Sequence, residues 1–334
     1  MTNSKPKVSV IVPIYGVEAY IERCAVSLFE QTLDDIEYIF VNDCTPDESM
    51  KILSQVLSRY PHRTDQVVII NQPKNMGAAK AREVGIKAAK GEYIIHCDSD
   101  DWVDKNMYFL MYQEAVAHQS DMLICDWFES DGNKHHAIRQ NIGHVSDFMS
   151  RVLNRSISGS LWNKLIACYI YHALDFFPTA HMMEDVAYTV QFVLKCRKIS
   201  YLEKPLYYYY NNEKSICKDI SNTACENRCK QACENIDLII SYLNNNKLDN
   251  KYRNEIVVLK NSARVFLWPL FMKHPRSYYK RWLSVYPEIN NVYPFTSGIA
   301  MNLRIIFGLS VIGVYPFIYK IIHKKKLIDQ YDLE

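Results

Sequence analysis

Short apolar runs alternate with amphipathic segments along the first third of the chain. The runs are rich in β-branched residues, which favour strands, and the segments between them repeat apolar positions three and four residues apart, as helices do. The pattern predicts strands at residues 8–14, 37–42, 67–70 and 92–97, and helices at residues 18–31, 46–59 and 77–89. Strands that alternate with helices predict an α/β fold with a mainly parallel central sheet flanked by helices.

The pattern changes after residue 130. A further strand-like run at residues 122–126 precedes a polar stretch at residues 129–143, which contains His135 and His136 and is predicted to be a loop. The following region is mixed and aromatic, and some tyrosines of the run Tyr207 to Tyr210 are expected to face inward. Residues 223–243 have a helical pattern. We therefore predict a domain at residues 1–220, with halves at 1–130 and 131–220, a helical region at 221–295, and a C-terminal segment at 296–334.

The C-terminal segment is strongly apolar at residues 305–319 and basic at residues 320–326. The apolar stretch is short for a spanning helix. Pro316 and the flanking Arg304 favour a segment that lies in the membrane interface, with its lysines on anionic headgroups. The alternatives are a buried C-terminal helix and a true membrane span. The prediction is a peripheral protein on the inner face of the cell membrane.

Composition sets only broad limits. The chain has 334 residues, of which 49% are hydrophobic, so it can bury a sizeable core. Its formal net charge of +2 provides no electrostatic reason to expect a nucleic-acid partner. The N-terminal residues contain no signal-peptide core, and the ten cysteines are scattered along the chain. Reduced thiols in a cytoplasmic protein are the expectation.

Polar residues follow each of the first four predicted strands. In an open parallel sheet, ligands bind beyond the carboxyl ends of the strands, so these residues are expected to meet at one edge. They are Tyr15 and Gly16 after the first strand, Asn42 and Asp43 after the second, Asn75 to Gly77 after the third, and Asp98 to Asp101 after the fourth.

Asp98 and Asp100 form the most informative group. In an extended segment the two side chains project to the same side and offer hard oxygen ligands to Mg²⁺ or Mn²⁺. Such an ion could bridge a diphosphate and neutralise the charge on a leaving group. The alternative is a polar turn, or a helix N-cap in which Asp101 begins the next helix.

Two further segments suit a nucleotide. The carboxylate of Asp43 could accept the imide N–H of a uracil, whereas Thr45 and Asp47 are interpreted as capping residues of the next helix. The small residues after Asn75 allow a close backbone approach, and Arg82 could return toward a base or phosphate. Close packing of helix on sheet is the alternative for the small residues.

These motifs together resemble the family 2 glycosyltransferases of the bacterial capsule and surface-polysaccharide type. The resemblance rests on residues 8–15, on residues 41–43, on Asn75 and Gly77 with Arg82, and on residues 98–101, and it covers residues 7–130. It implies the GT-A fold, which is Rossmann-like, here with a helical C-terminal extension. It also implies a nucleotide-diphospho-sugar donor, usually UDP-linked, a Mn²⁺ or Mg²⁺ ion, and inversion at the anomeric carbon.

The resemblance also implies roles for particular residues. The donor would contact Pro13, Tyr15, Asp43, Asn75, Gly77, Arg82, Asp98 and Ser99. Asp100 would ligate the metal together with Asp98. Asp185 would act as the base that deprotonates the acceptor hydroxyl. Glu184 would orient the base or bind the acceptor, and Trp162 would either stack on the acceptor or belong to the core.

The sequence therefore predicts an inverting glycosyltransferase, of the hexosyltransferase type, that acts on a glycan or lipid-linked acceptor in surface polysaccharide biosynthesis. A nucleotidyltransferase is disfavoured because no glycine-rich basic loop follows the first strand. A non-catalytic sugar-binding or scaffold protein is the remaining alternative. Cys225, Cys229 and Cys233 are interpreted as a buried helical stripe, and His181 as a residue outside the metal site.

Overall fold

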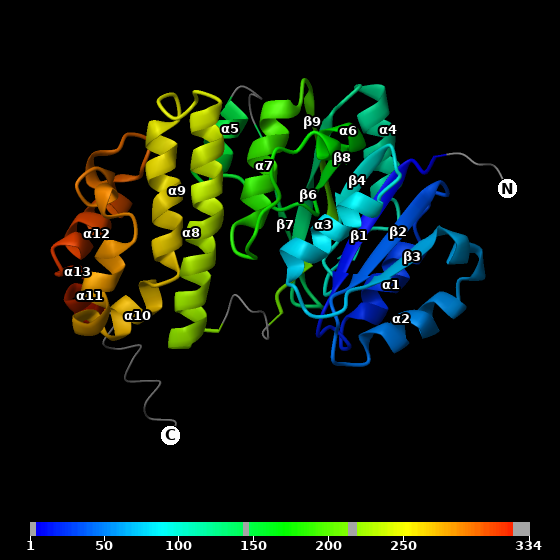
Figure 1. Cartoon of the computed structure of the whole chain (residues 1–334), viewed down its shortest axis with the longest axis horizontal. Helices are drawn as coiled ribbons and strands as arrows, with labels where there is room; N and C mark the ends of the chain where they lie inside the picture. Colours follow the sequence, from blue (N-terminus) through cyan, green and yellow to red (C-terminus); the bar gives the residue numbers. More distant parts are fainter. Residues whose placement is uncertain (1–4, 143–146, 213–218, 323–334) are drawn as a thin grey trace. The chain divides into compact units, whose positions relative to one another are not determined.

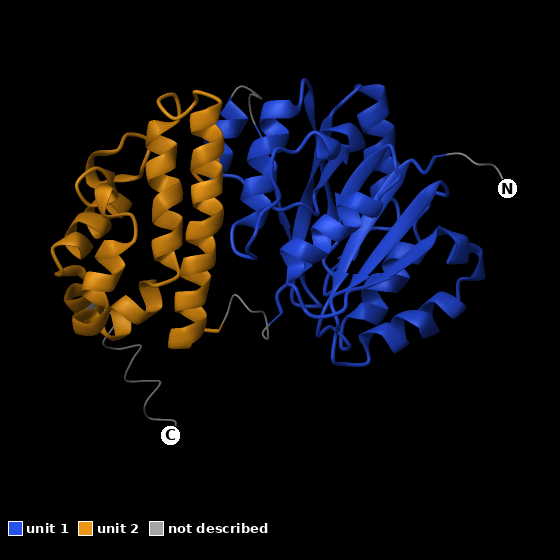
Figure 2. Ribbon diagram, in the orientation of Figure 1, with its two compact units in different colours: residues 1–152, 156–215 blue, residues 153–155, 216–334 orange. Residues whose placement is uncertain are grey.

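The computed structural model describes residues 5–142, 147–212 and 219–322. The chain divides into two compact units (Figure 2), and each is described by itself. The first comprises residues 1–152 and 156–215, and the second comprises residues 153–155 and 216–334.

The first unit is built around one mixed sheet. Among its described residues, nine strands form the sheet in the order β3-β2-β1-β4-β8-β6-β9-β5, with β7 paired to β6. The strands are β1 (Val8–Ile14), β2 (Ile36–Asn42), β3 (Val67–Asn71), β4 (Tyr93–His96), β5 (Trp102–Val103), β6 (Met122–Ser130), β7 (His135–Ile138), β8 (Lys164–Ala167) and β9 (Ile199–Tyr210).

The strands β3, β2, β1 and β4 are parallel, as the alternating pattern predicts. β1 and β2 are almost wholly buried, which explains why both are nearly continuous apolar runs. Ile14 pairs with Asn42, and Asn42 pairs with Asn71. This register brings the carboxyl ends of three strands to one level at the same edge of the sheet.

The other half of the sheet is not parallel throughout. β8 runs antiparallel to both β4 and β6, and β5 runs antiparallel to β9. The prediction of a loop at residues 129–143 is wrong over part of its length, because β6 extends to Ser130 and β7 pairs back on it. A tight turn makes this hairpin possible: Asp131 Oδ1 accepts the N–H groups of Asn133 and Lys134, and Gly132 has a φ of 99°.

Helices cover both faces of the sheet (Figure 1). α1 (Ile21–Phe29), α2 (Ser49–Ser58) and α4 (Met107–Ala117) share one core with the inward side chains of β1 and β2. α3 (Ala78–Ala88) packs on the opposite face, where a Cβ at Gly85 would lie 2.4 Å from Ile11 Cγ2. Four further described helices precede residue 216: η1 (Pro61–Gln66), α5 (Phe148–Leu153), α6 (Cys168–His172) and α7 (Glu184–Lys195).

The second unit is helical. Its elements are α8 (Asn222–Asn245), α9 (Arg253–Val265), α10 (Trp268–Lys273), α11 (Pro275–Ser284), η4 (Pro287–Asn290), η5 (Tyr293–Phe295), α12 (Met301–Val311) and α13 (Tyr315–Ile322). The predicted cysteine stripe on α8 is confirmed for Cys225 and Cys229, which are buried, while Cys233 is half-buried. Arg264 is fully buried, and its guanidinium donates to backbone oxygens around η4.

The apolar C-terminal segment forms two helices instead of one. α12 and α13 are bent by 112° at the break between them, where Gly313 has a φ of 75°. No single helix in the described residues is long and apolar enough to cross a membrane, although this bent pair passes that test of length and composition when the two helices are taken together. Residues 323–326 of the predicted basic stretch lie outside the described residues.

Candidate active site

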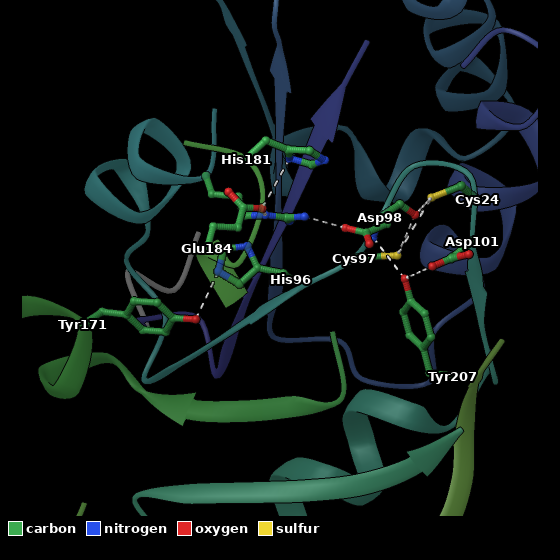
Figure 3. Close-up of polar contacts among 10 residues, drawn as sticks. Cys24, His96, Cys97, Asp98, Asp101, Tyr171, His181, Glu184 and Tyr207 are labelled. Atoms are coloured by element: carbon green, nitrogen blue, oxygen red, sulfur yellow. Dashed lines mark hydrogen bonds and ion pairs between the residues drawn. The ribbon is translucent and has the colours of Figure 1, made fainter. Parts of the chain in front are cut away.

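The segment Asp98 to Asp101 joins β4 to β5 at the carboxyl edge of the parallel strands. Asp101 is 1% exposed; its Oδ2 accepts the hydroxyl of Tyr207 at 2.6 Å, and its Oδ1 accepts the N–H of Tyr210 at 2.7 Å (Figure 3). The alternative in which Asp101 begins the next helix does not hold, because residues 102 and 103 pair with β9 and the next helix begins at Met107. Asp101 instead ties the loop to β9.

Three residues that the sequence analysis did not assign hold the rest of this loop. The Tyr207 hydroxyl accepts the N–H of Asp98 at 3.0 Å, and Arg23 Nη2 donates to the carbonyl of Asp100 at 2.9 Å. Asn212 Nδ2 donates to Asp100 Oδ2 at 3.3 Å. The expectation of inward-facing tyrosines is confirmed for Tyr207, but no sequence signal pointed to Arg23 or Asn212.

Burial and neighbouring charges raise the pKa values of two carboxylates of the loop, Asp100 and Asp101. Burial raises the pKa of Asp100, and the nearby charge of Asp98 raises it further. Burial raises the pKa of Asp101 well above its usual range, with added contributions from Asp100 and Asp98. A divalent cation beside Asp98 and Asp100 would offset this repulsion, so the pair fits a metal ion.

The chain by itself provides only part of a metal site. Within the described residues, no three His, Cys, Asp or Glu side chains come together in a metal-binding group. His181 contacts Glu184, with its Nδ1 3.9 Å from Glu184 Oε1. Asp98 and Asp100 would therefore provide two ligands, and the remaining ligands would be water or phosphate oxygens, which Mg²⁺ commonly uses.

Asp43 organises the loop after β3. Its carboxylate is 2% exposed and accepts Gln72 Nε2 and the N–H groups of Met76 and Gly77, each at 2.7 Å. Asn75 Oδ1 also accepts the N–H of Gly77, at 3.0 Å. The contact of Asp43 with a uracil stays a prediction; the structure adds that the same carboxylate positions the start of α3.

The loops after β1 and β2 are linked to each other. Thr45 Oγ1 accepts the N–H of Gly16 at 2.8 Å, and Asp47 accepts the N–H of Ser49 in the first turn of α2 at 3.2 Å. The N-cap of α2 is Glu48, so Asp47 accepts a backbone N–H at the start of this helix without being its cap, and Thr45 holds the loop after β1. Of the other predicted donor contacts, Pro13 lies in β1, Tyr15 is 47% exposed and Ser99 is buried.

Arg82 pairs with two carboxylates that come from separate segments of the chain. Its Nη2 lies 2.8 Å from Asp98 Oδ1, and its Nε lies 2.9 Å from Glu184 Oε1 (Figure 3). The Arg82 and Glu184 side chains are only 10% and 5% exposed. Burial alone would lower the pKa of Arg82, but the charges of Asp98 and Glu184 raise it above its usual value. Arg82 therefore stays charged and links the loop after β4 to the start of α7.

This ion pair retains unused hydrogen-bonding capacity. Arg82 Nη1 and Glu184 Oε2 are buried and have no hydrogen-bond partner among the described residues. Unsatisfied buried polar atoms are costly, so a polar ligand group that reaches them would be stabilised.

Asp185 lies beside this ion pair in sequence but has a different environment. It is half-buried, and a Cβ at Gly159 would lie 3.2 Å from its Oδ2, so the glycine leaves this carboxylate space. Glu184 is buried against Arg82 instead. The expectation that the two acids point to different faces of the helix agrees with these contacts.

Trp162 belongs to the core of the first unit. It is 8% exposed, stacks on Tyr207 with ring centroids 4.3 Å apart, and contacts Trp127 edge to face. The core alternative considered from the sequence therefore describes its packing. Tyr207 holds Asp98 and Asp101, so Trp162, which packs on Tyr207, supports the carboxylate loop through this tyrosine.

Three features together define a GT-A glycosyltransferase architecture. They are the parallel strands that end at one edge, the paired carboxylates after β4 and the acidic start of α7. The glycosyl transferase family 2 model matches residues 9–175. The putative glycosyltransferase EpsH of Bacillus subtilis is 30% identical over 77% of this chain and 76% of its own length. The chain belongs to glycosyl transferase family 2.

Other comparisons agree with this family. The uncharacterized glycosyltransferase EpsJ of Bacillus subtilis is 30% identical, and the match spans 63% of each protein. The crystal structure of S. aureus TarS 1-349 in complex with UDP-GlcNAc has a TM-score of 0.69 at 20% identity, over 93% of this chain and 89% of that chain. This likeness confirms the predicted GT-A fold.

Proposed function

We propose that this chain is an inverting glycosyltransferase that moves a sugar from a nucleotide-diphospho-sugar, UDP-linked, to a hydroxyl of a glycan or lipid-linked acceptor in surface polysaccharide biosynthesis. The observation that carries the proposal is the Arg82 bridge between Asp98 on the donor side and Glu184 next to Asp185. The TarS structure contains UDP-GlcNAc, which supports a UDP-linked donor.

Asp98 and Asp100 would hold a Mn²⁺ or Mg²⁺ ion, which would neutralise charge on the departing diphosphate. The chain itself prepares these carboxylates. Arg23, Tyr207 and Asn212 fix the loop that carries them, so that little reorganisation is needed when the donor binds. Arg82 adds a fixed positive charge beside Asp98.

Asp185 would act as the general base. Its carboxylate takes the proton of the acceptor hydroxyl while that oxygen forms a bond to the anomeric carbon. The bond between the anomeric carbon and the phosphate oxygen breaks on the opposite side, and the nucleoside diphosphate leaves with the electron pair. The anomeric configuration is thereby inverted.

Glu184 would act as a positioning residue for this base. It precedes Asp185 at the first turn of α7, where Met183 adopts a left-handed conformation with a φ of 66°. The ion pair with Arg82 holds this strained turn in place. The donor loop and the base would thus be held in register by one guanidinium.

Donor turnover should depend on a divalent cation. With a panel of nucleotide sugars, we expect Mn²⁺-dependent release of the nucleoside diphosphate with at least one donor, and its loss on chelation. Asp100→Asn should raise the Mn²⁺ concentration needed for half-maximal release, because it removes one anionic ligand. Release that is unaffected by both chelation and Asp100→Asn would contradict the metal assignment, and no release with any donor would contradict the transferase proposal.

We also propose that the second unit attaches the protein to the inner face of the cell membrane. Large apolar side chains are exposed along its last described helices, at Phe295, Met301, Leu303, Ile305, Ile312, Val314, Phe317 and Ile321. A terminal segment this rich in exposed apolar side chains suits contact with the interface of a membrane. The exposed Lys320 on α13 adds a positive charge suited to anionic headgroups.

Vesicle flotation tests this attachment. The full chain should float with phosphatidylcholine vesicles that contain phosphatidylglycerol, and less with phosphatidylcholine alone. The triple variant Ile305→Ser, Ile312→Ser, Phe317→Ser should bind at least about tenfold more weakly. Full burial of one such apolar side chain contributes about 1.5–3 kcal/mol, and the loss of one is already enough for a tenfold change in affinity. Val265→Ser, at an exposed apolar residue of α9, should bind like the wild type. Equal flotation of the triple variant would exclude this surface.

A further inference from the structure

A pocket lies on the first unit, apart from the residues assigned above to the donor and the base. It has a volume of about 490 Å³ and is formed by α1, by β5 and the residues after it, and by single residues of β7 and β9. This volume is in the range of small-molecule sites. Asp43, Arg82, Asp98 and Asp185 do not line it.

One wall of this pocket belongs to a row of aromatic rings that crosses three strands. Trp102, Tyr208 and Phe128 are cross-strand neighbours on β5, β9 and β6. Trp102 and Tyr208 are stacked with ring centroids 5.2 Å apart, and Tyr208 and Phe128 are stacked at 4.8 Å. His135 lies edge-on to Tyr208 at 5.1 Å. Such rigid, partly exposed rings provide apolar contact area with polar edges.

The polar lining of the pocket has no net charge. Arg23 and Lys105 contribute two positive charges, and Glu30 and Asp104 contribute two negative charges. A phosphate-bearing ligand would need an excess of positive charge, so the balance favours a neutral ligand with many hydrogen-bonding groups. Arg23 Nε is buried and has no hydrogen-bond partner in the described part of the chain.

Arg23 also connects this pocket to the carboxylate loop. Its guanidinium lies 3.8 Å from the centre of the Trp102 ring, and its Nη2 donates to the carbonyl of Asp100. The pocket is therefore backed by the segment that carries Asp98 and Asp100. A chain-like ligand with one end near this loop could continue into the pocket.

We propose that this pocket binds a neutral oligosaccharide, as a subsite for sugars of the acceptor or product chain away from the reacting hydroxyl. Pyranose rings have apolar C–H faces that pack on aromatic side chains and hydroxyl groups that pair with Arg23, Glu30 and Lys105. The identification of the oligosaccharide as acceptor or product rests on the proposed glycosyltransferase activity; the binding of the oligosaccharide does not.

Direct binding separates these two claims. The probes are cellohexaose, maltohexaose and N-acetylchitohexaose, titrated in the absence of donor and followed by ligand-observed NMR and calorimetry. At least one hexasaccharide should bind the full-length wild type. Tyr208→Ala and His135→Ala should each weaken that binding about three- to tenfold, as expected for the loss of one aromatic contact. Phe109→Ala, at an exposed aromatic residue of α4 outside the pocket, should bind like the wild type.

Three results would overturn the proposal. The first is that no hexasaccharide binds the wild type. The second is that binding is unchanged in both pocket variants, and the third is that UMP displaces the oligosaccharide from the pocket. His135 is exposed on β7, so His135→Ala should fold and remains available for the test if Tyr208→Ala unfolds. Oligosaccharide binding without any donor turnover would support this pocket while contradicting the proposed transferase function.

Discussion

The Asp185→Asn variant is expected to lose about 10²- to 10⁴-fold in kcat, the usual contribution of a general base. The amide keeps the size of the side chain but cannot take a proton from the acceptor hydroxyl. The KM for the donor should stay nearly unchanged, because Arg82, on the proposed donor side, pairs with Asp98 and Glu184 and not with Asp185. The measurement is the initial rate of nucleoside diphosphate release with donor and acceptor at saturation.

A matched control shows whether the loss is specific. Asp65→Asn changes an exposed carboxylate of η1 and should leave kcat at the wild-type level. Thermal unfolding of Asp185→Asn should also resemble that of the wild type, since Asp185 is half-buried and, among the described residues, accepts the N–H of its neighbour Val186. Near wild-type turnover by Asp185→Asn would remove this residue from the mechanism.

The Arg82→Met variant should lose about 3–5 kcal/mol of unfolding free energy at neutral pH, together with its transferase activity. Removing one partner of a buried ion pair leaves the other charge uncompensated, and Arg82 has two such partners, Asp98 and Glu184. Glu184 is the more costly of the two because it is 5% exposed, against 29% for Asp98. Chemical denaturation measures the loss.

The loss should depend on pH in a defined direction. Burial already raises the pKa of Glu184, and the charge of Arg82 opposes this rise. In Arg82→Met the folded-state pKa should therefore rise further above the unfolded value, so the folded state binds more protons than the unfolded state between the two values. The stability of the variant then falls as pH rises through that window. The deficit relative to the wild type should be smaller at pH 5 than at pH 7.

A second substitution and a surface control complete this test. Adding Glu184→Gln to Arg82→Met removes the more deeply buried of the two uncompensated charges and should restore part of the stability without restoring activity. Arg59→Met breaks an exposed ion pair with Glu22 and should cost no more than about 1 kcal/mol. If Arg82→Met were as mild as Arg59→Met, the bridge would not stabilise the fold.

Half of the sheet could be predicted from the sequence and half could not. β1 and β2 are long, apolar and regularly followed by helical patterns, so their parallel pairing followed from local signals. β8 is a four-residue strand that contains the buried Lys164, and β7 is exposed and polar. Neither strand shows an alternating pattern of apolar and polar residues. β8 is instead stabilised by its neighbours β4 and β6, and β7 by the turn at Gly132.

The candidate site shows the same division. Asp43, Asp98 and Asp100 were found because they follow buried strands, and that position implies one edge of the sheet. Arg23 and Gln72 were missed because each looks like an ordinary polar residue in its own segment. Their roles depend on contacts 77 and 29 positions away, with Asp100 and Asp43.

Local periodicity and strand-end chemistry by themselves determined the α/β class, the edge at which the site lies and the identity of its carboxylates, because those signals are carried within a few neighbouring residues. Only the tertiary structure decided what those residues contact. Arg82 lies 16 positions from Asp98 and 102 from Glu184. The fold brings the three side chains together, with Arg82 and Glu184 buried and Asp98 partly exposed, so the guanidinium pairs with the protein's own carboxylates. Between α12 and α13 the sequence itself interrupts the helix with Gly313 and Pro316, and the tertiary structure decided the angle of 112° between the two helices.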